Sequence, residues 1–166
     1  TLAIELNNIE LIVQHIEPEQ YENIQQKTEK FPQQSFIDFI KSLCKFTREL
    51  FISGKITKQF WFDMLVSVLE TNIHRTINNE WSEVWNEVSI FSIEIGLSEN
   101  VSDATVVVNS LKQLIKKYLN FSKETNTINY QQKFFKPLLN IWQNTLHDET
   151  KKMISQSLKD IIHHHC

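Results

Sequence analysis

Residues 81–96 of this 166-residue chain, WSEVWNEVSIFSIEIG, show most clearly that its fold is helical. The large apolar side chains of this stretch recur at steps of three and four residues, which is the spacing of one face of an α-helix. Asn78 or Asn79 is suited to cap the start of this helix, and Gly96 is expected to end it. The side chains that we expect to face a protein core are Trp81, Val84, Trp85, Val88, Phe91 and Ile95.

The same periodicity extends to both sides of this stretch. Apolar stripes predict further helices at about 2–16, 36–50, 57–69, 98–119, 130–146 and 148–162. Residues 19–31 are interpreted as a short helix or a loop, and residues 120–129 as a polar connection. The run TVVV, residues 105–108, keeps helical spacing on its flanks, so it is also expected to be helical. Pro137 is expected to kink or break its helix, because proline lacks a backbone N–H.

Composition and the spacing of the helix starts favour an all-α fold of stacked helical hairpins. The chain has two glycines and three prolines, too few for a turn-rich β-sandwich. The starts expected near Thr57, Ser98 and Asp148 are separated by about 40 to 50 residues, which is the period of armadillo and HEAT repeats. We therefore predict an armadillo/HEAT-like α-solenoid forming one domain over residues 1–166, with a compact helical bundle as the alternative.

The charge and the cysteines limit the classes of partner and compartment. There are 17 Lys and Arg against 20 Asp and Glu, a net charge of −3, and no basic run suggests a nucleic-acid partner. Cys44 and Cys166 cannot make a disulfide framework, and they fit a reducing, cytoplasmic compartment. No apolar run reaches the ~18 residues of a membrane span. Because the chain begins with Thr1, we expect a fragment of a longer protein.

Residues with catalytic or metal-binding chemistry are few. Glu70 and His74 lie four positions apart on an expected helix, which suits two metal ligands, but a solvated ion pair is the favoured interpretation. Cys44 follows Leu43 on an apolar face and is expected to be buried rather than nucleophilic. With glycines only at 54 and 96, no phosphate-binding glycine loop is available. We therefore predict no enzymatic activity, no cofactor and no metal site in this chain.

Several motifs occur in a characteristic order along the chain. They are FIDFIKSLCKFTRELF at 36–51, Asn72 and Arg75 ahead of Trp81, Ser82 and Trp85, then Phe91, Gly96 and Ala104, SLKQLIKKYL at 110–119, and YQQKFFKP at 130–137. This ordered set resembles the first homology-downstream (HDS) domain of the large brefeldin-A-inhibited guanine-nucleotide-exchange factors for Arf GTPases, the BIG and Sec-seven type. The resemblance is strongest over residues 36–162. One extra residue between Arg75 and Trp81 departs from the family pattern.

The resemblance implies a non-catalytic regulatory module of vesicle and protein transport. Such a module is expected to bind GTP-loaded Arf and the catalytic exchange domain of its parent protein, and to relieve autoinhibition. It is expected to be cytoplasmic and recruited peripherally to Golgi and trans-Golgi membranes, with contact to anionic lipid. The glutamate loop of the catalytic exchange domain is absent from this sequence. The alternative function is a freestanding helical-repeat adaptor that binds peptides.

Five polar residues are candidates for the partner-facing surface: Lys112, Gln113, Lys116, Lys117 and Lys136. Gln113 and Lys117 lie one helical turn apart, and Lys136 directly precedes Pro137. Lys112, Lys116, Lys117 and Lys123 could together meet anionic lipid, but an ordinary solvated helix face is the favoured interpretation because the net charge is negative. For Gln113, Lys117 and Lys136 the capping of backbone carbonyls of the next hairpin is the favoured interpretation, and a partner-facing surface is the alternative.

Overall fold

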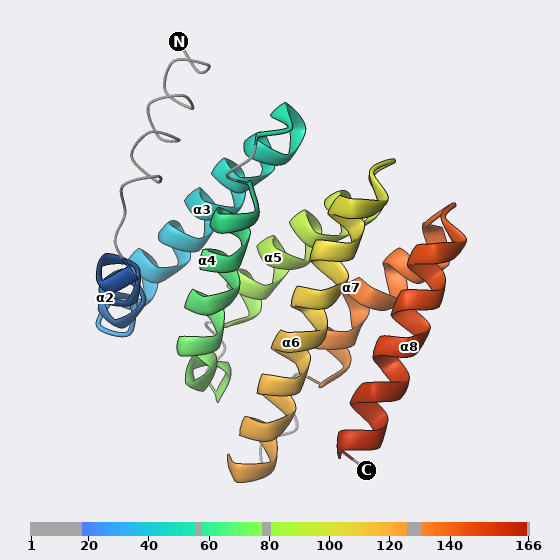
Figure 1. Cartoon of the computed structure of the whole chain (residues 1–166). Coiled ribbons are helices and arrows are strands. Elements are labelled where there is room, and N and C mark those ends of the chain that lie inside the picture. The colour runs from blue at the N-terminus through green and yellow to red at the C-terminus, as the bar shows by residue number, and fades with distance from the viewer. Residues whose placement is uncertain (1–17, 56–57, 78–80, 126–130, 166) are drawn as a thin grey trace. The chain divides into compact units, whose positions relative to one another are not determined.

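The computed structural model describes residues 18–55, 58–77, 81–125 and 131–165, and every regular element within them is helical (Figure 1). The all-α prediction is thereby confirmed for this part of the chain. The helix expected at 2–16 and the caps expected at Thr57 and at Asn78 or Asn79 lie outside it. In chain order the elements are α2 (Pro18–Thr28), α3 (Gln33–Ser53), α4 (Lys58–Thr71), the 3-10 helix η1 (Ile73–Ile77), α5 (Trp81–Gly96), α6 (Val101–Thr125), α7 (Gln131–Asn144) and α8 (Asp148–His165).

The chain divides into two compact units, Thr1–Thr71 and Asn72–Cys166. In the first unit, α3 packs against α4 and α2 packs against α4. Aromatic side chains join α3 to α4, with ring centroids 5.0 Å apart in the pair Phe46–Trp61 and 5.8 Å apart in the pair Phe51–Phe62. α3 ends at Gly54, whose φ of 65° is a left-handed conformation that glycine adopts without strain.

In the described part of the second unit, the four α-helices form two layers of two, and η1 contacts α5 and α6. α5 packs against α7 in one layer, α6 packs against α8 in the other, and α5–α6, α6–α7 and α7–α8 contacts join the layers (Figure 1). Consecutive helices therefore pack as hairpins. The assignment to an armadillo- or HEAT-like array stays a prediction.

One phenylalanine ties three helices of this unit together. Phe134 of α7 is fully buried between Trp85 of α5 and Tyr118 of α6, with both ring centroids 4.2 Å away. The planes are nearly parallel, at 20° to Trp85 and 7° to Tyr118. Trp81 lies beyond, at 6.5 Å from Phe134, and is also buried. The prediction that the face of 81–96 carrying the two tryptophans points inward is confirmed, because all six of its expected apolar members are buried.

The limits of several elements differ from the sequence-based expectation. α6 continues to Thr125, so the connection expected at 120–129 is wrong for residues 120–125. α6 begins at Val101 rather than at the expected Ser98. The side-chain oxygen of Asn100 accepts a hydrogen bond from the Ser102 backbone N–H at 3.0 Å. This geometry is that of an asparagine N-cap. Residues 105–108 are helical as expected, and most of 19–31 is helix rather than loop.

Gly96 ends α5 as predicted, but its role is to make space. Gly54 is the only described glycine with positive φ, so Gly96 does not serve as a left-handed terminator. A Cβ atom at Gly96 would overlap Cδ1 of Ile141 on α7 and lie 2.9 Å from its Cγ1. Glycine therefore permits the close approach of α5 and α7 on which the candidate site depends.

Candidate functional site

Four of the five candidate residues lie on α6. Two of these, Lys112 and Lys116, lower the pKa of the Asp160 carboxyl group on α8. The Lys112 ammonium lies 2.5 Å from a carboxylate oxygen of Asp160, and Gln156 donates to the other oxygen at 2.9 Å. The hydrogen bond from Lys112 is the main cause that lowers the pKa of Asp160 from its ordinary value of 3.8. Gln156 adds to this effect, as do the charges of Lys112 and Lys116. Much of the positive charge of Lys112 is thus balanced within the protein.

Gln113 and Lys117 are exposed on α6. Neither side chain hydrogen-bonds another residue of the described ranges, so within these ranges they do not cap a carbonyl of a neighbouring hairpin. Their assignment to a partner-facing surface stays a prediction. The fifth candidate, Lys136, lies on α7 in the other layer, away from the Lys112–Asp160 pair at the α6–α8 contact.

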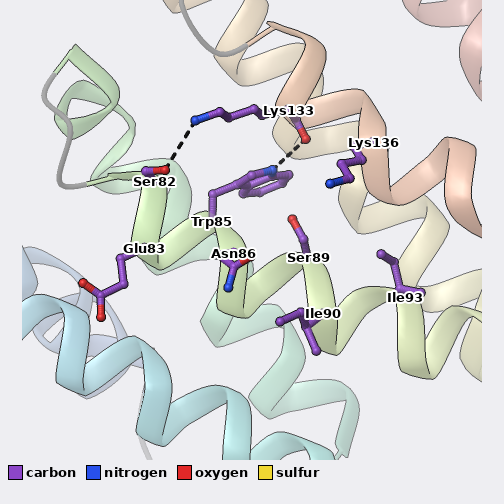
Figure 2. Close-up of a pocket in the computed structure, with 9 residues that line it drawn as sticks. All are labelled: Ser82, Glu83, Trp85, Asn86, Ser89, Ile90, Ile93, Lys133 and Lys136. Atoms are coloured by element: carbon purple, nitrogen blue, oxygen red, sulfur yellow. Dashed lines mark hydrogen bonds between the residues drawn. The ribbon is translucent and has the colours of Figure 1, made fainter.

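Lys136 lines an open groove of about 620 Å³ between α5 and α7, which we call the α5–α7 groove (Figure 2). α7 contributes Lys133 and Lys136 to its lining. Polar and apolar side chains of α5 form the rest: Ser82, Glu83, Trp85, Asn86, Ser89, Ile90 and Ile93. In this groove the candidate Lys136 lies together with Lys133 and with the exposed Ile90.

Pro137 accounts for a hydrogen bond that joins the two helices of this groove, α5 and α7. α7 continues through Pro137 without a break, so of the two expected effects of this proline, a kink or a break, the break is wrong. Proline has no N–H to donate to the carbonyl four residues earlier, which here belongs to Lys133. The indole N–H of Trp85 donates to this carbonyl instead, at 2.8 Å (Figure 2). A bond from α5 therefore replaces the missing helical bond of α7 and fixes the two helices in register.

The two lysines make one end of the groove positive. The Lys133 side chain extends over Trp85 and donates to the Ser82 hydroxyl at 3.3 Å, and the Lys136 ammonium points toward Trp85 (Figure 2). Trp85 meets Lys133 near the start of both helices, and Gly96 meets Ile141 near their ends, so α5 and α7 run in the same direction. Both helix N-termini, with their partial positive charge, therefore lie at the lysine end. The Glu83 carboxylate is directed away from the lysines.

Sequence reasoning identified Lys136 but missed Lys133 and the α5 wall. The available signal was the outward face of 81–96, where Ser82, Asn86, Ser89 and Ile93 follow helical steps of three and four. It was not sufficient, because nothing local indicates that α7 lies beside this face.

Residues with metal or nucleophile chemistry do not form a second site in the described ranges. There, no three His, Cys, Asp or Glu side chains gather closely enough to share a metal ion. Glu70 ends up on α4 and His74 on η1, so the expectation that they share one helix is wrong. Cys44 is buried as predicted, with 3% of its surface exposed. None of the described helices combines the length and the apolar character that crossing a bilayer requires.

Comparison with known proteins relates the chain to large exchange proteins. Residues 116–166 match the family described as Mon2/Sec7/BIG1-like, HDS. Brefeldin A-inhibited guanine nucleotide-exchange protein 1 of Arabidopsis thaliana is 29% identical over 143 residues, 86% of this chain and 8% of that protein. Brefeldin A-inhibited guanine nucleotide-exchange protein 4 of Arabidopsis thaliana is 29% identical over 135 residues, 81% of this chain and 8% of that protein.

A fungal protein shows the same relation. The ADP-ribosylation factor guanine nucleotide-exchange factor sec72 of Schizosaccharomyces pombe is 28% identical over 131 residues, 77% of this chain and 7% of that protein. The chain thus spans less than a tenth of the length of these curated relatives. We conclude that this chain, helical throughout its described residues, is similar to one region of the large BIG-type Arf exchange factors, and that its C-terminal residues 116–166 are similar to their HDS family.

Proposed function

We propose that this chain is the first HDS region of a large BIG/Sec7-type Arf exchange factor and acts as a non-catalytic regulatory module. The observation that carries this proposal is the similarity to named exchange proteins along 86% of the chain. Because the match covers only 8% of such a protein, the exchange reaction itself is assigned to other parts of it. The helical hairpins of the second unit support a role as a scaffold that offers a surface.

The proposed partners are GTP-loaded Arf and the exchange domain of the parent protein, at the trans-Golgi membrane. GTP binding both exposes the switch surface of an Arf protein and releases its lipid anchor, so nucleotide state and membrane attachment become linked signals. A rigid helical module that engages this surface would position the exchange domain on a membrane that already holds active Arf. Autoinhibition would be relieved by this change of position.

Liposome flotation with the purified chain tests the proposal. Arf loaded with a non-hydrolysable GTP analogue, but not Arf loaded with GDP, is expected to carry the chain to the floating fraction. Lys117→Glu tests the exposed face of α6, and Lys152→Glu, which changes an exposed lysine of α8, is the matched control. Equal recruitment by both nucleotide states would reject the proposed recognition of Arf.

A freestanding peptide-binding adaptor is the second candidate, and the α5–α7 groove favours it. The neighbouring coding sequence separates the two functions. An exchange domain encoded upstream in the same reading frame supports the regulatory module, and a short isolated reading frame supports the adaptor.

A further inference from the structure

The lysine end of the α5–α7 groove has the properties of a site for a carboxylate. Lys133 and Lys136 lie three residues apart on the same face of α7, and both are exposed. The Gln131–Asn144 sequence of α7 contains no acidic residue. The Ser82 and Ser89 hydroxyls line the same groove as additional donors. Two ammonium groups and the hydroxyls together attract a negative group.

The other end of the groove is apolar. Ile90 and Ile93 line it, and half of the Ile90 surface is exposed. From Ser82 to Ile93 the groove follows three turns of α5, a length of about 16 Å. A ligand that fills this length must present an anionic group at one end and an apolar group at the other.

We propose that the α5–α7 groove binds an acidic amphipathic segment of a partner protein. A carboxylate of this segment lies between Lys133 and Lys136, and a large apolar side chain covers Ile90 and Ile93. The inference rests on the proposed role in protein interaction, but it does not depend on Arf being the partner.

Two features favour a protein segment over an anionic membrane surface. Lys133 is drawn along the groove to Ser82 rather than projecting outward, whereas a bilayer attracts lysines that protrude toward it. In addition, exposed Ile90 and half-buried Ile93 extend the groove away from the lysines, and a lipid headgroup would leave this apolar end uncovered. An acidic helix with apolar residues on one face satisfies both ends.

Selection from a random peptide library displayed on phage tests this proposal. The whole chain is the bait, in parallel with the charge-reversed variant Lys133→Glu/Lys136→Glu and the control variant Lys152→Glu/Lys159→Glu on exposed positions of α8. Peptides with Asp or Glu one to three helical turns from Leu, Ile, Phe or Met, a separation that the length of the groove admits, are expected from the chain and from the control. The charge-reversed variant is expected to lose them.

A synthetic copy of the most enriched peptide then gives the affinity by fluorescence anisotropy. Binding is expected to weaken about tenfold or more with Lys133→Glu/Lys136→Glu, and also with Ile90→Asn, while the α8 control leaves it unchanged. Thermal melts establish that each variant is folded. No enrichment, enrichment of peptides without acidic residues, or equal affinity for the charge-reversed variant overturns the proposal.

The two proposals fail separately. If Arf-dependent flotation succeeds and the peptide selection fails, the regulatory function stands and the groove is not its acidic-peptide site. If the selection succeeds and flotation fails, the groove is a peptide site and the recognition of Arf is rejected. Recovery of the chain with phosphatidylserine vesicles that Lys133→Glu/Lys136→Glu abolishes, without any peptide enrichment, would assign the groove to lipid and overturn the inference.

Discussion

At the scale of single residues, Pro137 and Trp85 form one functional pair although they lie on different helices. The proline removes a helical donor from the Lys133 carbonyl, and the indole N–H of Trp85 takes its place. A partly buried carbonyl without a donor would carry a desolvation cost. The tryptophan is therefore needed for its N–H as well as for its ring, which stacks on Phe134.

We expect Trp85→Phe to lower the free energy of unfolding by about 1–3 kcal/mol through the lost donor, with a further contribution from reduced packing. In a Pro137→Ala background the backbone N–H of residue 137 becomes available to the Lys133 carbonyl. Trp85→Phe should then cost about 1 kcal/mol less than in the wild-type chain. Urea unfolding of the four chains measures this coupling. Equal costs in both backgrounds would show that the indole bond does not compensate for the proline.

At the scale of elements, contact between α5 and α7 depends on the absence of a side chain at Gly96. Ile141 occupies the space beside it and is fully buried, so it has little freedom to move. The same two helices form the groove, and their register is set by this contact and by the Trp85–Lys133 hydrogen bond.

Gly96→Ala is expected to destabilise the chain by about 1–3 kcal/mol, because overpacking outweighs the helix propensity of alanine. Ile141→Val removes the Cδ1 atom that the new methyl group would meet, and by itself should cost about 0.5–1.5 kcal/mol. The double variant should lose less stability than the sum of the two single changes. Thermal or urea unfolding measures the difference, and strictly additive losses would contradict the steric explanation.

The contact between α6 and α8 has a pH dependence that follows from Asp160. The folded state lowers the pKa of this carboxyl group from 3.8, chiefly through the hydrogen bond from Lys112. The unfolded state therefore binds a proton more readily, and the stabilisation by this pair is present above pH 3.8 and is lost as the pH falls through the lower folded-state pKa. The effect is small because the pair is solvent-accessible.

We expect Asp160→Asn to lower the unfolding free energy at neutral pH and low salt, and the difference from wild type to shrink as the pH falls below 3.8. Urea titrations at a series of pH values measure it. In a Lys112→Met background the same change should have much less effect at neutral pH. A difference that persists unchanged in strong acid would assign the effect to something other than the ion pair.

Across the whole molecule, the positively charged lysines of α6 belong to a chain whose net charge is −3. The Lys112 charge is balanced by Asp160, which leaves exposed Lys117 as the main candidate on α6 for contact with lipid. An exposed lysine near an anionic surface contributes about 1 kcal/mol, which is too little to hold a protein on a membrane.

Phosphatidylserine liposomes without Arf should therefore recruit little of the chain, and raising the salt concentration should release what is bound. Asp160→Asn frees the charge of Lys112 and is expected to increase this recruitment modestly. Flotation measures both effects. Strong, salt-resistant recruitment by lipid alone would contradict the assignment of the α6 lysines to a secondary role.

The all-α class and the inward faces of the helices could be predicted from residue spacing alone, because a helix repeats every 3.6 residues and this pattern is local. The inward face of 81–96 followed from it. Two predictions from local sequence were wrong. The polar residues 120–125 do not interrupt α6, because packing outweighs local propensity. Pro137 does not break α7, because the indole N–H of Trp85 on another helix bonds the carbonyl that the proline leaves without a donor.

The surroundings of the lysines could not be predicted in this way, because they depend on contacts between helices far apart in the sequence. Lys112 and Lys117 lie on one helix, yet the acid that pairs with Lys112 is 48 residues away in sequence. Lys136 belongs to a groove that also needs Lys133 and the outer face of α5, which is brought alongside by the contact of Gly96 with Ile141. Charge pairing and concavity depend on which helices become neighbours, and residue periodicity carries no information about that.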